Sequence, residues 1–165
     1  MTTDDLVVTR WATRFMGRLF SCSIGKGGLS SDKREGDGAT PAGVLRIAGM
    51  LYRPDRLEAP TTWARPIGPA DLWSDDPTAA DYNQLVRAPY APSHEALRRA
   101  DPLYDLILLT DWNYPVSVPG LGSAIFIHRW RKPRHPTEGC VAFSPGDLLW
   151  IAQRVNLGTR VVVRP

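Results

Sequence analysis

Apolar and polar positions alternate along much of the chain, which predicts a protein built mainly from β-strands. The alternation is clearest over residues 6–24, where a break near Gly17 indicates a hairpin. Apolar runs at residues 44–51, 105–110 and 124–128 are typical of buried strands. A further strand is expected close to the C-terminus, over residues 159–163.

Helix signals are few and short. Ser144 is a favoured N-cap residue, Pro145 suits the first helical position, and the Asp147 carboxylate can reach back to complete a capping box. Ser93 predicts a second N-cap, for a short helix over residues 94–100. Together these elements predict a mainly β, sandwich-like fold with one or two short helices.

Length and composition agree with this class. A chain of 165 residues, 43% hydrophobic and 22% charged, suits a single domain over residues 1–165 with a real core. No apolar run approaches the roughly 18 residues that a membrane helix needs. The N-terminal MTTDDLVV lacks the basic-then-apolar pattern of a secretory signal, so no export signal is visible in the sequence.

Residues 53–92 form a long segment rich in proline and polar residues. Long excursions of this kind are usually functional or disordered. Aromatic residues, among them Trp73 and Tyr82, argue for order here. We expect Trp73 and Tyr82 to form a lid or wall over a substrate cleft; the alternative is that they only staple the loop.

The charge of the chain is moderate and comes mainly from arginine. Net charge is +3, and 17 of the 20 basic residues are Arg, which favours forked hydrogen bonds to carboxylate or phosphate. The densest basic cluster covers residues 128–135. It could bind single-stranded nucleic acid, form a solvated loop, or form the rim of a site for an acidic substrate. The modest charge and the lack of a recognisable nucleic-acid-binding module argue against nucleic acid.

The two cysteines, Cys22 and Cys140, are too few for a disulfide framework, although one bridge between them is geometrically possible. Cys140 follows Gly139 where a loop meets a strand, and His128 ends an apolar strand twelve residues earlier. Both could be structural. Together they can supply a thiolate activated by an imidazolium, reactive below the ordinary thiol pKa of about 8.5. A zinc site using His128, His135 and Cys140 is a weaker alternative, because the spacing is irregular.

Three segments identify a family resemblance: KREGDGATPAG at 33–43, GSAIFIH at 122–128 and PTEGCVAF at 136–143. The chain resembles L,D-transpeptidase catalytic domains of the YkuD type, the cysteine enzymes that cross-link peptidoglycan. Shorter pieces, WSDDP, DYN and EALRR between residues 73 and 99, resemble the compact single-domain branch of the family.

The resemblance implies roles for individual residues. Cys140 resembles the nucleophile and His128 its proton acceptor and donor, with the ring oriented by the main chain of Arg129. Thr137 and Gly139 occupy the small-residue turn whose backbone resembles the oxyanion hole. Neither a metal nor another cofactor is implied.

Two departures affect substrate recognition. Glu138 stands where better-studied members have histidine, and residues 141–143 lack the arginine or asparagine that often follows the cysteine. The two catalytic residues are also closer in sequence than is usual. The arginine that binds substrate carboxylates must therefore come from elsewhere, and the candidates are Arg129, Arg131 and Arg134.

The implied activity is formation of cross-links between a donor and an acceptor stem peptide through a cysteine thioester. The links are of the 3–3 type or, as in some compact members, of the 1–3 type between L-Ala and diaminopimelate. The alternative is an L,D-carboxypeptidase or amidase that uses the same Cys–His pair. A catalytically inactive binding module would normally have lost one of the two residues. A monomer is expected, located in the periplasm or cell envelope where the substrate lies, with no nucleic-acid partner and no membrane span.

Overall fold

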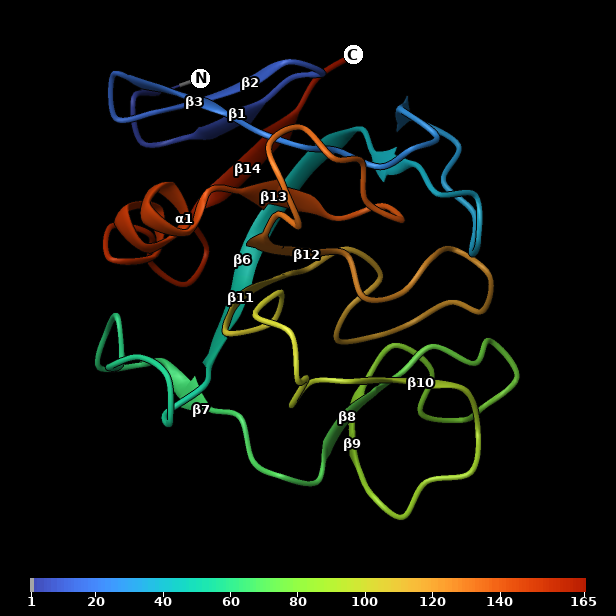
Figure 1. The fold of residues 1–165 in the computed structure, drawn as a ribbon. Coiled ribbons are helices and arrows are strands. Elements are labelled where there is room, and N and C mark those ends of the chain that lie inside the picture. The colour runs from blue at the N-terminus through green and yellow to red at the C-terminus, as the bar shows by residue number, and fades with distance from the viewer. Residues whose placement is uncertain (1) are drawn as a thin grey trace.

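The computed structural model describes residues 2–165 and consists mainly of β-strands (Figure 1). The only α-helix of these residues is α1 (Pro145–Ala152). The strands are β1 (Leu6–Val8), β2 (Ala12–Phe15), β3 (Arg18–Ser21), β4 (Leu29–Ser30), β5 (Thr40–Pro41), β6 (Gly43–Tyr52), β7 (Arg65–Pro66), β8 (Asp71–Ser74), β9 (Leu85–Arg87), β10 (His94–Ala96), β11 (Leu106–Thr110), β12 (Phe126–Arg129), β13 (Val141–Phe143) and β14 (Arg160–Val163). The expected mainly β class is confirmed.

Nine strands form one large, nearly closed sheet. Its order is β13-β12-β11-β6-β14-β1-β2-β3, with β7 paired to β6. The ten-residue strand β6 runs through the middle of this sheet (Figure 1). The C-terminal strand β14 lies between β6 and β1, antiparallel to the former and parallel to the latter. A three-stranded sheet, β10-β8-β9, and the short pair β4-β5 complete the fold.

The two faces of the large sheet pack against different layers. In β11, Leu106 and Leu108 belong to a core cluster on the side of α1, whereas Ile107 and Leu109 belong to a second cluster with Trp73 of β8. This division follows from the strand geometry, because successive side chains point to opposite faces. Since both faces are covered, β11 is buried along its whole length.

The helix begins as its sequence predicts. Ser144 Oγ accepts a hydrogen bond from the Asp147 N–H at 3.1 Å and donates its own proton to the Asp147 carboxylate at 2.7 Å. These contacts satisfy one of the backbone donors that a helix N-terminus leaves without an intrahelical partner.

The second predicted helix, over residues 94–100, is wrong. Residues 94–96 form β10, which pairs antiparallel with β8 so that Glu95 lies opposite Trp73. The capping signal at Ser93 is local, whereas the partner strand lies about twenty residues earlier. Strand pairing and the complete burial of Leu97 in the second core cluster override the weak helix propensity.

Candidate active site

The parallel pair β12–β13 places Cys140 and His128 on one face of the large sheet. In the register of this pair, Ile127 lies opposite Val141, and both point into the core on the side of α1. Phe126, one residue earlier in β12, and Cys140, immediately before β13, belong to the cluster on the other face. His128 is two residues beyond Phe126, so its side chain emerges on the same face as the thiol.

The turn before Cys140 is fixed by side-chain hydrogen bonds to its backbone. Thr137 Oγ1 donates to the Cys140 carbonyl at 2.6 Å and accepts from the Gly139 N–H at 3.2 Å. Thr40 Oγ1 donates to the Gly139 carbonyl at 2.7 Å and accepts from the Gly25 N–H at 2.8 Å. Gly139 has φ +142°, and a Cβ there would lie 3.0 Å from the Ala39 carbonyl oxygen. The position therefore requires glycine.

The Cys140 thiol is held by two backbone groups. Its Sγ donates to the Ala124 carbonyl at 3.1 Å and accepts from the Phe126 N–H at 3.4 Å. Burial raises the pKa of Cys140 to about 12, and the nearby Glu95 carboxylate adds to the rise. The Phe126 N–H and Lys33 oppose it only in part. The thiol is therefore protonated at neutral pH in the free protein.

His128 is also neutral at that pH. Its Nδ1 lies 2.7 Å from the Arg129 carbonyl oxygen, which can only accept, so the ring proton is on Nδ1 and Nε2 has a free lone pair. Burial lowers the pKa of His128 to about 4, despite this hydrogen bond. The expected thiolate–imidazolium pair is thus replaced, in the free protein, by a neutral thiol and a neutral imidazole.

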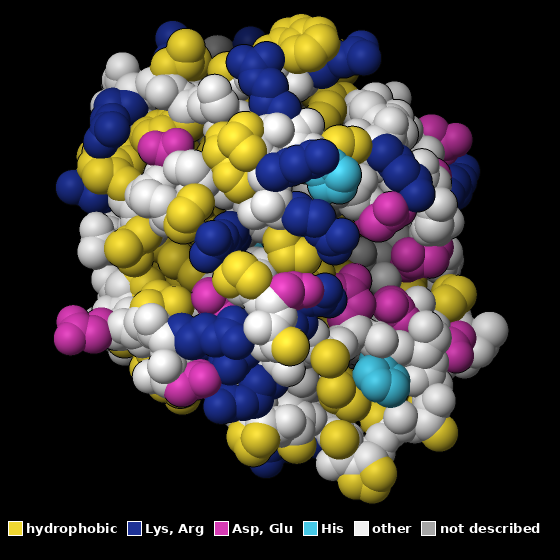
Figure 2. Space-filling model, in the orientation of Figure 1, with side chains coloured by type: hydrophobic (Ala, Val, Ile, Leu, Met, Phe, Trp, Pro, Cys, Tyr) yellow, Lys and Arg dark blue, Asp and Glu magenta, His cyan; other side chains and the backbone are white. Residues whose placement is uncertain are grey.

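Both side chains open into one cavity of about 490 Å³. The cavity is strongly charged with both signs, and Figure 2 shows Asp and Glu side chains gathered around a hollow near the centre of this face. Its charged lining consists of Lys33, Glu35, Asp75, Glu95, Arg99, Arg131 and Glu138. A cavity of this size can hold part of a charged peptide.

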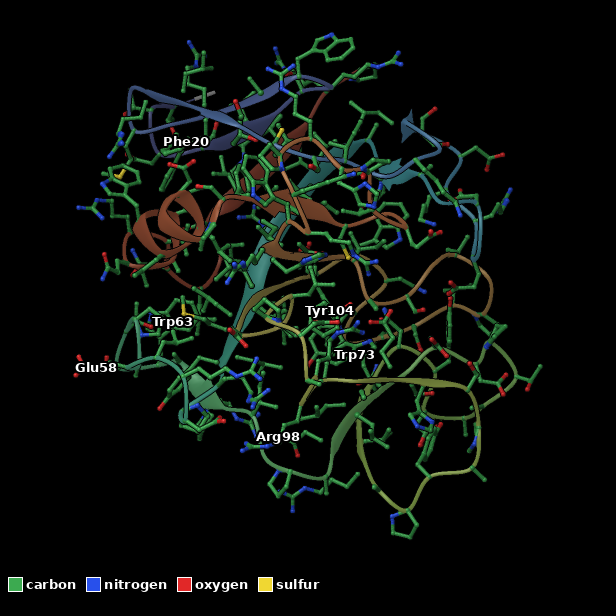
Figure 3. All side chains as sticks on the ribbon, in the orientation of Figure 1. Phe20, Glu58, Trp63, Trp73, Arg98 and Tyr104 are labelled. Carbon is green, nitrogen blue, oxygen red and sulfur yellow. The ribbon has the colours of Figure 1, made fainter. Side chains whose placement is uncertain are left out.

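A chain of contacts leads from His128 to this charged lining. The Tyr104 ring packs edge-on against the His128 ring, with centroids 5.3 Å apart, and its hydroxyl donates to the Glu95 carboxylate. Arg99 lies over the Tyr104 ring at 5.2 Å and is itself held by two hydrogen bonds to Asp101, at 2.9 and 2.6 Å. Tyr104 lies between the large and the three-stranded sheets, close to Trp73 (Figure 3).

Comparison with known families decides the identification. The model of the L,D-transpeptidase catalytic domain, YkuD, matches residues 3–163. The chain belongs to the YkuD family. Its members act on peptidoglycan, which implies an enzyme of the cell envelope. A search of curated proteins gave no match.

The structure brings some of the site residues predicted from the sequence to the cavity and leaves others outside it. Thr137, Gly139 and Arg131 line the cavity beside the Cys–His pair. Arg129 contributes its carbonyl to His128, but its side chain is absent from the cavity lining.

Trp73 and Tyr82 also do not line the cavity, contrary to the expectation of an aromatic lid or wall. Both side chains are almost completely buried, Trp73 in the second core cluster. Their contact with the cavity is indirect: the Tyr82 hydroxyl donates to Glu35, which also accepts from Ser123 Oγ at 2.8 Å.

Sequence reasoning missed several cavity residues. Lys33, Glu35, Glu95 and Arg99 were visible only as parts of the family segments KREGDGATPAG and EALRR, with no individual role. Lys33 is the clearest signal in retrospect: it is only 4% exposed, and its ammonium bonds Asp37 at 2.5 Å. Lysine side chains are almost never buried to this degree unless they are paired, so the Lys33–Asp37 pair marks this part of the cavity as a candidate functional site.

The alternatives raised by the sequence lack the geometry they need. Cys22 and Cys140 are both free thiols. Within residues 2–165, no group of three or more His, Cys, Asp or Glu side chains is arranged to hold a metal ion, so the zinc site has no support. In the same residues, no helix has the length and apolar character of a membrane span.

Proposed function

We propose that the protein is a peptidoglycan L,D-transpeptidase in which Cys140 forms a thioester with a donor stem peptide. The observation that carries the proposal is the exit of Cys140 and His128 from one face of the β12–β13 pair into a single charged cavity. The hydrogen-bonded pairing of β12 and β13 fixes the relative position of the two side chains, which a nucleophile and its base require.

Acylation begins from the neutral pair. The Cys140 sulfur attacks a carbonyl carbon of the donor stem as the thiol proton passes to His128 Nε2, the nitrogen left free by the bond to Arg129. The carbon–nitrogen bond then breaks, and His128 returns the proton to the leaving amine. Because the Gly139 N–H already donates to Thr137, the N–H of Cys140 is the better candidate to stabilise the oxyanion.

Deacylation determines the product. An amine of the acceptor stem attacks the thioester, His128 accepts a proton from it, and the Cys140 thiol is regenerated. The new amide is a 3–3 link when the attacked carbonyl belongs to the third donor residue, and a 1–3 link when it belongs to L-Ala. If water attacks instead, the same pair acts as an L,D-carboxypeptidase or amidase.

The charges of the cavity suit both substrates. Arg131 makes no ion pair with another residue of the described chain, so its guanidinium is available to bind a donor carboxylate. Lys33 and Arg99 are held by Asp37 and Asp101 and add positive charge without being free. The carboxylates of the same cavity, among them Glu35 and Glu95, can attract the ammonium of the acceptor.

Incubation of the purified protein with disaccharide tetrapeptides, in water enriched in ¹⁸O, tests the proposal. Mass spectrometry should detect cross-linked dimers, and fragmentation of the dimers distinguishes 3–3 from 1–3 links. Monomers that have lost residues and gained ¹⁸O would assign hydrolysis in place of transfer. If the protein converted none of these substrates while Cys140 remained reduced, the proposal would be rejected.

A further inference from the structure

A second cavity, of about 460 Å³, lies outside the reaction cavity. It is formed by Arg10 and Trp11 at the start of the N-terminal hairpin, by residues 22–28, and by Arg134 and Pro136. Among residues 2–165, only Pro136 lines both cavities. The segment that leads to Cys140 therefore separates two hollows of similar size.

The second cavity carries charge of one sign. Its lining includes Arg10, Lys26 and Arg134 and, within the described chain, no acidic residue. Arg10 and Arg134 form no ion pair with any residue from 2 to 165. Lys26 pairs with Glu138 at 2.7 Å, but both side chains are exposed, so a ligand can replace Glu138 easily. Lys and Arg side chains also lie across the upper half of the face shown in Figure 2.

The rim of this cavity also offers an exposed aromatic surface. At the rim, the Trp11 side chain is 65% exposed, with Arg10 over its ring at 5.1 Å. An exposed indole of this kind offers a flat surface for a sugar or peptide group.

We infer that the second cavity binds a free carboxylate of the disaccharide–peptide substrate, away from the carbonyl that reacts at Cys140. The guanidinium groups of Arg10 and Arg134 hold the carboxylate, and the group attached to it lies on Trp11. The inference rests on the proposed function, because stem peptides supply the free carboxylates. It adds a contact that fixes the substrate without touching the reacting atoms.

Binding is measured with the Cys140→Ala protein, which cannot turn over its ligand, by calorimetric titration with a disaccharide tetrapeptide. Adding Arg10→Gln and Arg134→Gln together should weaken binding by about tenfold or more. Arg14→Gln, an exposed arginine of the same hairpin that lines neither cavity, should leave the affinity unchanged. The tetrapeptide with its carboxylates amidated should bind all variants equally weakly.

The inference is overturned if the double variant binds the tetrapeptide as tightly as the Arg14→Gln control. It is also overturned if the amidated ligand or inorganic phosphate binds as well as the tetrapeptide, or if oligothymidylate binds more tightly. In the active protein, the double variant should raise KM and retain kcat. If the substrate's carboxylates and the two arginines contribute to binding but the active protein turns nothing over, the inference stands and the proposed function is rejected. If the active protein turns substrate over but binding does not depend on these charges, the proposed function stands and the inference is rejected.

Discussion

Each of the two cavities contains one of the two cysteines, and their surroundings differ in kind. Cys140 and Cys22 are both buried, and burial raises the pKa of both thiols. Cys140 shares its cavity with a histidine and with side chains of both signs. Cys22 donates weakly to the Thr9 carbonyl at 3.7 Å, in a cavity whose described lining contains neither His nor acid.

The difference shows that burial alone does not make a thiol reactive. Both cysteines are uncharged at neutral pH, so neither is a ready thiolate. Cys140 is distinguished by the His128 imidazole on the same face of the sheet, which in the proposed mechanism accepts its proton when a carbonyl approaches, and by charged neighbours that alter the energy of the thiolate. The comparison leads to three tests.

The largest expected effect is loss of turnover. Cys140→Ala should reduce transpeptidation by roughly a thousandfold or more, because no covalent intermediate can form. Cys22→Ala should retain most of the activity, since its thiol faces no base. Product formation from tetrapeptides is the measurement, with circular dichroism to verify folding. An active Cys140 variant or an inactive, folded Cys22 variant would reverse the assignment.

A smaller effect concerns the reactivity of the thiol. Glu95→Gln removes the carboxylate that helps raise the pKa of Cys140, so the pH midpoint of iodoacetamide alkylation at Cys140 should fall. In the parent protein that midpoint should lie well above the ordinary thiol value of about 8.5. Cys22→Ala serves as the background, so that Cys140 is the only thiol.

The matched control for this test is Glu58→Gln, an exposed carboxylate that lines neither cavity. It should leave the midpoint in place. The pH midpoint for alkylation of Cys22, measured in the Cys140→Ala protein, should likewise not change when Glu95→Gln is added. A common shift of both thiols would show that the effect is not local to the reaction cavity.

The smallest effect is on acid stability. Burial lowers the pKa of His128 to about 4, so between the unfolded value of about 6.5 and pH 4 the unfolded chain binds a proton that the folded protein does not. The free energy of unfolding should fall over this range by on the order of 2–3 kcal/mol. Glu95, whose pKa is raised by burial, acts in the opposite direction.

Urea titrations at several pH values isolate the histidine. His128→Gln should flatten the loss of stability between pH 6.5 and 4 relative to the parent, whatever its stability at pH 7. An unchanged slope would mean that the ring is protonated in the folded protein, in conflict with its burial.

The sequence predicted those parts of the fold that depend on local pattern. The alternation in β2, the apolar runs of β6 and β11 and the capping box of α1 are set by residues adjacent in sequence, and these predictions are confirmed. The helix at residues 94–100 failed because a good cap signal competed with pairing to β8. The short strands β7–β9 were read as irregular because each has only two to four residues.

For the site, the motifs directed attention to Cys140 and His128 because both lie next to recognisable strand and turn signals. Many of the remaining cavity residues, including Asp75 and those from residues 33–36 and 95–104, lie far from the pair in sequence. Their convergence depends on how the three-stranded sheet packs on the large sheet. The sequence also could not predict that the Cys140 thiol and the His128 imidazole are both neutral, because their protonation follows from burial rather than from residue identity.

The connection between β12 and β13 is short, and its middle is loosely tied. Trp130 N–H donates to the Phe143 carbonyl at 2.8 Å, and Thr137 N–H donates to the Ile24 carbonyl at 2.9 Å, so both ends are fixed. Between them, the backbone hydrogen bond recorded is local, from His135 to Lys132 at 3.1 Å. Within this stretch, Arg131 lines the reaction cavity and Arg134 lines the second cavity.

The residues between Trp130 and Thr137 can therefore change without disturbing the β12–β13 pairing. Under the proposed function, residues gained, lost or replaced there would change which substrates bind, while the β12–β13 ladder would keep the sulfur and the imidazole in register. Substrate specificity would then change through small insertions without loss of the catalytic pair.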